Sequence, residues 1–499
     1  MTAPALRSRR WDIFLWSLLA VCIGRLWLMK IASSFWIDEI VTAFVVRFGP
    51  AHPSLAVAPQ VSESIYYWLP RAAQRMFGFS EIAYRIPSAA VMGVALFLMA
   101  RLAMRLIHPS AGWFAVFACL AMRGISYEAI DARPYALGIA VGASSMWFLV
   151  RWLDSARWIQ GLLFVLFATL VWRVHLAFWP FYLILVLYAA VRIASSRSND
   201  RTAVTWWKAV VIFALLGLSL VPVLETTLSL FRHAAAHVIV APPTFRDLRR
   251  TLRLGLMLEC DGGAVLLGLL FHRLRNRQPL SQATLALIGG WWLGYPLAIF
   301  VFSRVTGDVL FVDRYLSIAL PGVALAATFL ASRFLPDQFW EPAAAVLGLG
   351  VLCFLGQWQE LRPRHDLSDW RGAARSISEL APDIPVICPS PFIEAKPPSW
   401  TPDYPLPSFL YSHLAIYPIG GTPYRFPFQV AGQMPPEGSE YAASLSGGVL
   451  PRSPRFMIYG DVLSVRDWRI WLQNRPELAG WRNQELGPFG NVSVVKFER

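Results

Sequence analysis

The sequence predicts a mainly α-helical fold, in which a bundle of membrane-spanning helices is followed by a small C-terminal α/β domain outside the membrane. Hydrophobic residues make up 56% of the 499 residues and charged residues only 15%, whereas soluble domains average about 25% charged residues. Long apolar runs fill the first 360 residues and then stop, and prolines and charged residues become frequent. This composition excludes a simple soluble enzyme and a disordered chain.

About eleven apolar runs approach or reach the length of about 20 residues that a helix needs to cross a bilayer. The first is too long for a signal peptide and lacks a small-residue cleavage site, so we expect it to be retained. The runs cover residues 11–31, 87–107, 111–122, 134–153, 158–172, 175–192, 206–224, 255–271, 282–303, 314–332 and 341–357.

The distribution of arginines predicts the orientation of these spans, because Lys and Arg collect in cytoplasmic loops. Arg7, Arg9 and Arg10 precede the first span, and alternate loops such as the one with Arg151 and Arg157 are also basic. An odd number of spans then places the C-terminal domain outside. The net charge of +14 fits contact with anionic headgroups better than nucleic-acid binding.

We divide the chain into a transmembrane domain, residues 1–360, and an extracytoplasmic α/β domain, residues 361–499. The first domain carries outer loops at 32–86 and 123–134. Amphipathic or apolar patterns in the second domain predict two helices and three strands. The helices are Trp370–Leu380 and Val465–Leu478, and the strands are Pro385–Cys388, Arg455–Tyr459 and Val492–Phe497.

Two adjacent carboxylates, Asp38 and Glu39, directly follow the first span. One of them could take a proton from an acceptor hydroxyl or amine, or both could simply lie in the first turn of a short helix over residues 38–48, where the helix dipole favours acids. In the same loop, the aromatic run Tyr66-Tyr67-Trp68 could stack on a substrate or belong to an interfacial aromatic belt.

The second outer loop contains Asp131, Arg133 and Tyr135. The planar guanidinium of Arg133 could bind a phosphate or only pair locally with Asp131. Similarly, His175 at the start of a span is a site residue or an interfacial histidine. Arg314, followed by Tyr315 at the start of a late span, needs a partner at that depth, and a lipid phosphate would be suitable.

Taken in this order, the motifs resemble the polytopic GT-C glycosyltransferases that use polyprenyl-phosphate sugars, such as the protein mannosyltransferases and the aminoarabinose transferase of lipid A. The chain departs from that pattern at Ser62-Glu63-Ser64, where relatives carry a His-Pro-Pro-like run. The resemblance covers most of residues 36–375 and rests on Asp38-Glu39, Tyr66-Tyr67-Trp68-Leu69, Phe77-Gly78, Arg85-Ile86-Pro87-Ser88, Asp131-Ala132-Arg133-Pro134-Tyr135, His175, Arg314-Tyr315-Leu316 and Asp369-Trp370-Arg371-Gly372-Ala373-Ala374-Arg375.

The resemblance implies that an acceptor attacks the anomeric carbon of a polyprenyl-phosphate sugar with inversion. Asp38 would be the base and Glu39 would orient Asp38 or the acceptor, while Arg133 and Arg314 would hold the departing phosphate. Further substrate contacts would come from Tyr66, Tyr67, Trp68, Asp131, Tyr135, His175 and Tyr315.

The expected partners are the polyprenyl-phosphate sugar, the membrane and a lipid, glycan or protein acceptor, with no nucleic acid. No cluster of ligands in the sequence indicates a metal, although a divalent cation such as Mg²⁺ or Mn²⁺ is compatible with the chemistry. The expected location is a bacterial inner membrane, with several spans and with the active site and the C-terminal domain on the periplasmic side.

Two other classes of protein fit the composition. A transporter or lipid-carrier flippase would use its membrane charges to line a pathway, but the matched broken helices typical of such proteins are not evident. In a non-catalytic scaffold, the Asp38-Glu39 pair would have no function. Substitutions in the first two outer loops would impair an enzyme most, whereas substitutions in the middle of spans would impair a transporter most.

Overall fold

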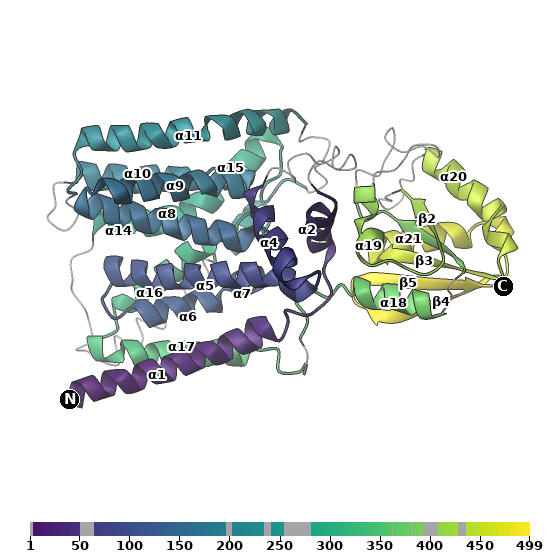
Figure 1. The fold of residues 1–499 in the computed structure, drawn as a ribbon, viewed down its shortest axis with the longest axis horizontal. Coiled ribbons are helices and arrows are strands. Elements are labelled where there is room, and N and C mark those ends of the chain that lie inside the picture. Colours follow the sequence, from purple (N-terminus) through teal and green to yellow (C-terminus); the bar gives the residue numbers. More distant parts are fainter. Residues whose placement is uncertain are drawn as a thin grey trace. The chain divides into compact units, whose positions relative to one another are not determined.

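The chain folds into two compact units, and each unit is assembled from three segments that are not consecutive in the sequence (Figure 1). One unit, here the helical unit, contains Met1–Ile31, Ser64–Tyr66 and Arg85–Pro363; the other, the α/β unit, contains Ala32–Glu63, Tyr67–Tyr84 and Arg364–Arg499. Most of the first predicted outer loop thus folds with the C-terminal domain. The computed structural model describes residues 3–49, 64–195, 202–233, 241–253, 281–361, 363–380, 383–392, 408–427 and 436–499.

Helices that could cross a membrane dominate the helical unit, as predicted. Within the described residues, seven helical segments are long and apolar enough to span a bilayer, and three apolar helices are shorter. The predicted span 255–271 lies outside the described residues. The long segments are Arg10–Leu28, Glu81–Leu106, Tyr135–Ser155, Leu176–Ala194, Trp206–Leu228, Gln282–Thr306 and Asp337–Leu355, and the short ones are Gly112–Ala121, Trp158–Val174 and Ser317–Ser332.

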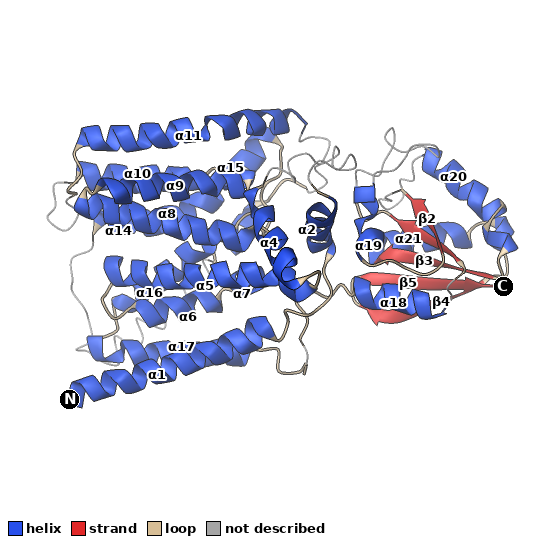
Figure 2. Ribbon diagram, viewed as in Figure 1, coloured by secondary structure: helices blue, strands red, loops and turns tan. Residues whose placement is uncertain are grey.

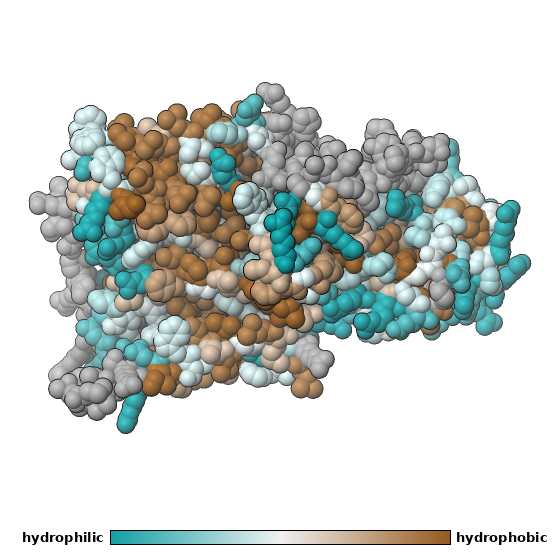
Figure 3. All heavy atoms as spheres, viewed as in Figure 1, coloured by the Kyte–Doolittle hydropathy of each residue, from teal (hydrophilic) through white to brown (hydrophobic). Residues whose placement is uncertain are grey.

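Apolar side chains cover much of the visible face of these helices (Figure 3), as expected for helices surrounded by lipid. The helices of this unit are α1 (Ala3–Ile23), η1 (Gly24–Leu28), α5 (Glu81–Leu106, whose first turn belongs to the α/β unit), α6 (Gly112–Ala121), α7 (Arg123–Glu128), α8 (Tyr135–Ser155), α9 (Trp158–Val174), η4 (Leu176–Phe178), α10 (Phe181–Ala194), α11 (Trp206–His233), α12 (Phe245–Thr251), α14 (Gln282–Gly289), η7 (Gly290–Gly294), α15 (Tyr295–Thr306), η8 (Ser317–Ala319), α16 (Leu320–Ser332), η9 (Asp337–Phe339) and α17 (Trp340–Leu355).

A buried arginine joins the ends of the first and last spans. Arg25, in η1, donates hydrogen bonds to the carbonyl oxygens of Gly356 (2.6 Å), Gln357 (2.7 Å) and Glu360 (2.8 Å), just after α17. It thereby satisfies carbonyls at a helix C-terminus, where a positive charge is also favourable. Because the C-terminal ends of α1–η1 and α17 lie together, the chain leaves both spans at the same end of the helical unit.

A second polar network joins α5, α8 and α10. Asp154 forms ion pairs with Arg105 (Nε–Oδ2, 2.9 Å) and with the buried Arg192 (Nη2–Oδ1, 2.9 Å). Arg192 also donates to the hydroxyl of Tyr188 at 2.9 Å. These residues lie at the ends of the helices that the sequence assigns to the arginine-rich side, and each charge has an opposite charge beside it.

The α/β unit contains a five-stranded sheet in the order β2-β1-β3-β5-β4 (Figure 2). Strand β1 pairs in parallel with β2 and β3, whereas β5 pairs antiparallel with β3 and β4. The elements of this unit are α2 (Ile37–Phe48), α4 (Trp68–Phe77), α18 (Trp370–Leu380), β1 (Pro385–Pro389), η10 (Ser408–Tyr411), α19 (Ser412–Ile416), β2 (Thr422–Phe426), α20 (Pro436–Gly447), η11 (Leu450–Arg452), β3 (Arg455–Asp461), α21 (Val462–Gln473), η12 (Pro476–Leu478), β4 (Arg482–Phe489) and β5 (Val492–Glu498), and η3 (Ile65–Tyr67) precedes α4.

Helices cover both faces of this sheet. Alternate residues of a strand point to opposite faces: Ile458 and Val495 pack with Trp468 of α21 in one core cluster, whereas Tyr459 packs its ring against Trp370 of α18, with 5.6 Å between centroids. The predicted helix Trp370–Leu380 and the three predicted strands are thus confirmed, and α21 begins and ends slightly earlier than predicted.

One carboxylate ties the first outer loop to the C-terminal sequence within the α/β unit. Glu81 Oε1 accepts hydrogen bonds from Arg371 Nη1 and from the hydroxyl of Tyr417, both at 2.8 Å. The Tyr417 hydroxyl in turn accepts from the Phe35 N–H at 3.0 Å, and Arg371 Nη2 donates to the Ala32 carbonyl at 3.0 Å. Three segments that are distant in the sequence therefore meet at Glu81.

We expect Glu81→Ala to lower the local stability of the α/β unit by about 1.5–3 kcal/mol, the contribution typical of hydrogen bonds to a charged group. Tyr417→Phe should cost about 1.5–3 kcal/mol as well, because it removes a hydrogen bond to the same charged group and the acceptor of the Phe35 N–H. Hydrogen–deuterium exchange of β3 and β5 in the full chain measures this free energy. Glu440→Ala, at an exposed position of the same unit, is the control. Equal exchange in Glu81→Ala and Glu440→Ala would contradict the role of Glu81.

A histidine is buried in the aromatic core of the α/β unit. His413 is fully buried beside Trp370 and Tyr459, with ring centroids 4.9 and 5.6 Å away. Neither of its ring nitrogens has a hydrogen-bond partner among the described residues. Burial lowers the pKa of His413 to about 3, so the folded chain keeps this ring neutral.

We therefore expect His413 to make the α/β unit less stable as the pH falls. Between its ordinary pKa of about 6.5 and about 3, the unfolded chain binds one proton more than the folded chain, so stability decreases as pH falls through that window. The slope is at most about 1.4 kcal/mol per pH unit. Melting temperatures of the wild type and of His413→Phe between pH 4.5 and 7.5 test this, and the variant should lose less stability at low pH. Parallel curves would contradict it.

Candidate active site

Three connections of the helical unit bring the predicted phosphate-binding residues to one place. Arg133 and Tyr135 lie where α8 begins, His175 lies between α9 and η4, and Arg314 and Tyr315 precede η8. Their rings are neighbours: the His175 ring centroid is 4.8 Å from that of Tyr315 and 5.7 Å from that of Tyr135, and the two tyrosine rings are 6.3 Å apart.

Both predicted arginines flank this aromatic cluster. The Arg133 guanidinium carbon lies 5.9 Å from the Tyr135 ring centroid, and that of Arg314 lies 5.5 Å from the Tyr315 centroid. At these distances the ring face attracts the cation. The aromatic rings thus hold two guanidinium groups at the end of an apolar bundle, which is an arrangement suited to an anion with an apolar tail.

The two arginines also act electrostatically on His175. Burial, followed by the positive charges of Arg133 and Arg314, lowers the pKa of His175 to about 3. His175 is therefore neutral at physiological pH, and the positive charge of the cluster comes from the two guanidinium groups. Both arginines lie against tyrosine rings that neighbour the same imidazole, although the two arginines are 181 positions apart in the sequence.

Asp131 is almost fully buried in the short connection between α7 and α8. Its main chain is fixed because its carbonyl oxygen accepts a hydrogen bond from Ser88 Oγ at 2.6 Å. Glu128, at the end of α7, is also buried. The predicted second outer loop thus carries two buried carboxylates close in sequence to Arg133.

The adjacent acids of the α/β unit occupy different environments. Both lie in the first turn of α2, where Asp38 is half-buried and Glu39 is fully buried. Glu39 Oε2 accepts a hydrogen bond from the Trp36 N–H at 3.3 Å and so caps the helix. The predicted short helix is therefore present, and the dipole at its N-terminus favours both acids.

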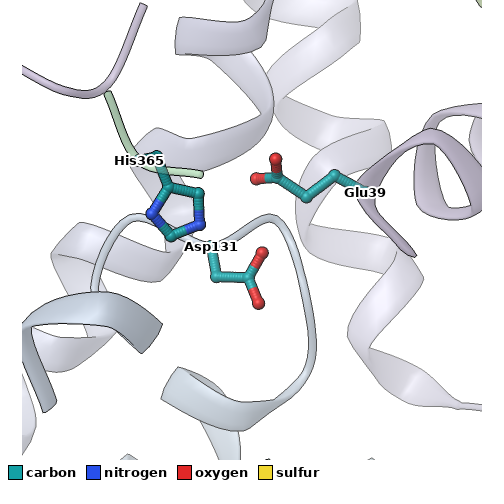
Figure 4. A group of neighbouring side chains, drawn as sticks. All are labelled: Glu39, Asp131 and His365. Atoms are coloured by element: carbon teal, nitrogen blue, oxygen red, sulfur yellow. The ribbon is translucent and has the colours of Figure 1, made fainter. Parts of the chain in front are cut away.

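A histidine that the sequence analysis did not single out faces Glu39. His365 is buried, and one of its ring nitrogens lies within 4.8 Å of a Glu39 carboxylate oxygen. Figure 4 shows the Glu39 carboxylate and the His365 ring pointing toward one another; it also draws Asp131, which belongs to the helical unit. A carboxylate and an imidazole are common ligands of divalent metals. The only sequence signal for His365 is its place between the last span and the Asp369-Trp370-Arg371 motif.

The three consecutive aromatics of the first outer loop diverge. Tyr66 and Tyr67 are buried, whereas Trp68, at the start of α4, is 74% exposed. Tyr66 belongs to the helical unit and Tyr67 and Trp68 to the α/β unit. Only Trp68 therefore offers most of its ring surface for stacking on a ligand or for a membrane interface.

No protein-family model and no curated protein sequence matches the chain. Solved structures do match it along its whole length. ArnT from Cupriavidus metallidurans in the apo state has a TM-score of 0.56 at 14% identity, with 98% of both chains covered. The same protein bound to undecaprenyl phosphate has a TM-score of 0.55 at 13% identity, with 97% of this chain and 98% of that chain covered.

The chain has the GT-C fold. The likeness to ArnT includes both units, so it confirms the predicted membrane bundle with a C-terminal α/β domain. The archaeal oligosaccharyltransferase AglB from Archaeoglobus fulgidus, in complex with an inhibitory peptide and a dolichol-phosphate, is also similar, with a TM-score of 0.41, 12% identity, and 97% of this chain and 74% of that chain covered.

Proposed function

We propose that this chain is an integral membrane glycosyltransferase that moves a sugar from a polyprenyl-phosphate carrier to a lipid, polysaccharide or protein acceptor. The observation that carries the proposal is the pair Arg133 and Arg314, which lie with Tyr135, His175 and Tyr315 at the end of an apolar helical bundle. The fold supports it, since the similar ArnT was solved with bound undecaprenyl phosphate.

The proposed reaction is a single displacement. The acceptor hydroxyl or amine forms a bond to the anomeric carbon, Asp38 takes the proton from the acceptor, and the bond from the anomeric carbon to the phosphate oxygen breaks. Polyprenyl phosphate leaves with the electron pair, and the configuration at the anomeric carbon inverts. Arg133 and Arg314 stabilise the negative charge that develops on the leaving phosphate.

A bacterial inner membrane, with the reaction on its periplasmic face, is part of the proposal. The lipid carrier supplies a long apolar tail, which suits a site at the end of membrane spans. It also supplies one phosphate, which suits the two guanidinium groups of Arg133 and Arg314. The arginine-rich loops that the sequence assigns to the cytoplasmic side support this orientation.

We also propose that Glu39 and His365 are two of the ligands of a divalent cation. The fit rests on two buried side chains, a carboxylate and an imidazole, with ligand atoms within 4.8 Å of each other. Such a cation would supply a Lewis acid near the start of α2. Asp38, the neighbouring half-buried carboxylate, would remain available for proton transfer.

Turnover tests the proposed transferase. The purified full chain in phospholipid would receive a panel of polyprenyl-phosphate sugars and crude membrane acceptors, and the release of polyprenyl phosphate would be followed. We expect Arg133→Gln and Arg314→Gln each to lower turnover about 100-fold, the typical effect of removing a donor that stabilises developing charge. Asp38→Asn should lower it about 100-fold or more, because a general base is lost.

Arg157→Gln is the matched control, because Arg157 is exposed at the opposite end of α9 from His175. It should turn over like the wild type. Turnover that survives in Asp38→Asn would keep the transferase and move the base to another carboxylate. If no donor releases polyprenyl phosphate although the wild type binds the carrier lipid, the transferase is wrong and a flippase becomes the better hypothesis.

Metal binding is measured separately from activity. Titration of the full chain with Mn²⁺, followed by electron paramagnetic resonance, should show one site whose affinity falls about tenfold or more in His365→Ala and in Glu39→Gln, since even outer-sphere partners of metals contribute 10–100-fold. His108→Gln is the control, because that histidine instead pairs with Asp337 at 3.1 Å. Equal Mn²⁺ affinity in all variants would refute the cation site.

A further inference from the structure

The main chain fixes which nitrogen of His175 carries a proton. The N–H of Ala177, two residues further along, donates a hydrogen bond to His175 Nδ1 at 3.2 Å. A ring nitrogen that accepts a hydrogen bond is unprotonated, so the proton of the neutral imidazole is on Nε2. Nε2–H is therefore the donor that the ring presents, and the side chain is only partly buried.

The surroundings of the ring keep it in place and neutral. Phe178, Tyr135 and Tyr315 lie around it, with centroids 5.2, 5.7 and 4.8 Å away. The charged groups that act on His175 are the guanidinium groups of Arg133 and Arg314, and they oppose a further positive charge beside them. The imidazole thus offers a hydrogen bond without a charge between two cationic side chains.

A buried tyrosine from another span fixes the two connections that carry these groups. The hydroxyl of Tyr295 lies 3.1 Å from the carbonyl oxygen of Ala177 and 3.0 Å from that of Tyr315, and its one proton is shared between these two acceptors. Tyr295 is fully buried. It holds the turn that follows His175 and the connection that contains Arg314 at a set separation.

An irregular stretch of helix presents this tyrosine. The π-helix η7 (Gly290–Gly294) ends directly before Tyr295, and such single π turns often occur at functional sites. Trp291, within η7, donates its Nε1–H to the carbonyl oxygen of Ile318 at 2.7 Å. Residues 291 and 295, one helical turn apart, therefore both fix main chain next to the Arg314 connection. Gly322 permits this close approach, since a Cβ atom there would lie 2.7 Å from the main chain of Trp291.

We propose that His175 donates a hydrogen bond from Nε2 to the phosphate of the polyprenyl carrier, and that Tyr295 is the positioning residue that holds this donor beside Arg133 and Arg314. This inference rests on the proposed function, because it assigns a third donor to the same leaving group. Nε2–H stabilises the negative charge that develops on the phosphate. It adds no positive charge that would retain the product.

Amide replacements of His175 test the assignment. In His175→Gln the amide nitrogen lies where Nε2 was, whereas in His175→Asn it reaches only the position of Nδ1. We expect His175→Gln to keep the affinity for undecaprenyl phosphate within about threefold, and His175→Asn and His175→Phe to lose about tenfold or more, as for a hydrogen bond to a charged group. A purely structural histidine would not distinguish the two amides in this way.

Tyr295→Phe removes one hydroxyl and nothing else. We expect it to weaken binding of undecaprenyl phosphate and to raise the KM for the donor about threefold to tenfold, as for the loss of one neutral hydrogen bond. Tyr182→Phe is the matched control, because the Tyr182 hydroxyl also donates to a main-chain carbonyl, that of Ala168, at 2.6 Å. It should cost similar stability and leave donor affinity unchanged.

Nitrogen NMR of the histidines in the full chain gives a readout independent of turnover. The ring of His175, assigned by its loss in His175→Gln, should show the proton on Nε2 and should not titrate between pH 5 and 8. A proton on Nδ1, wild-type affinity in His175→Asn, or equal donor affinity in Tyr295→Phe and Tyr182→Phe would overturn the proposal.

These outcomes separate the inference from the proposed function. Binding of undecaprenyl phosphate that depends on His175, without turnover of any sugar donor, would refute the transferase and keep the inference. Turnover by the wild type, together with unchanged affinity of His175→Asn for undecaprenyl phosphate, would keep the transferase and refute the inference. A wild-type chain that neither binds the carrier lipid nor turns over would overturn both.

Discussion

The absence of water in a bilayer is the constraint on which the helical unit depends. Polar groups among its spans must find partners inside the protein, because lipid offers none. Arg25 therefore binds a carbonyl at the end of α17, and Asp154 pairs with both Arg105 and Arg192. The hydroxyl of Tyr295 is shared between two main-chain carbonyl oxygens. The charged residues of these networks lie at the ends of the spans, and the arginines of the candidate active site also lie at helix ends.

The same constraint explains why the candidate phosphate site is built from connections and not from the middle of helices. Arg133, His175 and Arg314 each lie just before a helix begins, where the polar side chains need not enter the apolar part of a span. Burial is still sufficient there to keep His175 neutral, with a pKa of about 3. The site therefore offers an anion two positive charges and one neutral hydrogen-bond donor, and not three positive charges.

In the α/β unit, one carboxylate has a comparable role. Glu81 lies just after α4 but binds Arg371 and Tyr417, which come from the C-terminal sequence. The helix that carries Asp38 and Glu39 therefore belongs to the same unit as the sheet, although more than 300 residues separate them in the sequence. Burial and the nearby carboxylate raise the pKa of Tyr417 well above its ordinary range, so its hydroxyl remains a donor to Glu81.

The sequence by itself determined the class of fold and most elements, because these follow from local patterns. Apolar length predicted the spans, amphipathic spacing predicted α18 to the residue, and short apolar runs predicted β1, β3 and β5. Strands β2 and β4 were not predicted from the sequence. Their residues are largely exposed and include Pro, Gly and charged side chains, which are not typical of strands. Only the tertiary structure decided that His365 faces Glu39, that Trp68 points away from its buried neighbours, and that a tyrosine in a late span holds the turn of His175. Such pairings join residues tens to hundreds of positions apart, and packing and the satisfaction of buried polar groups select them, not any local spacing.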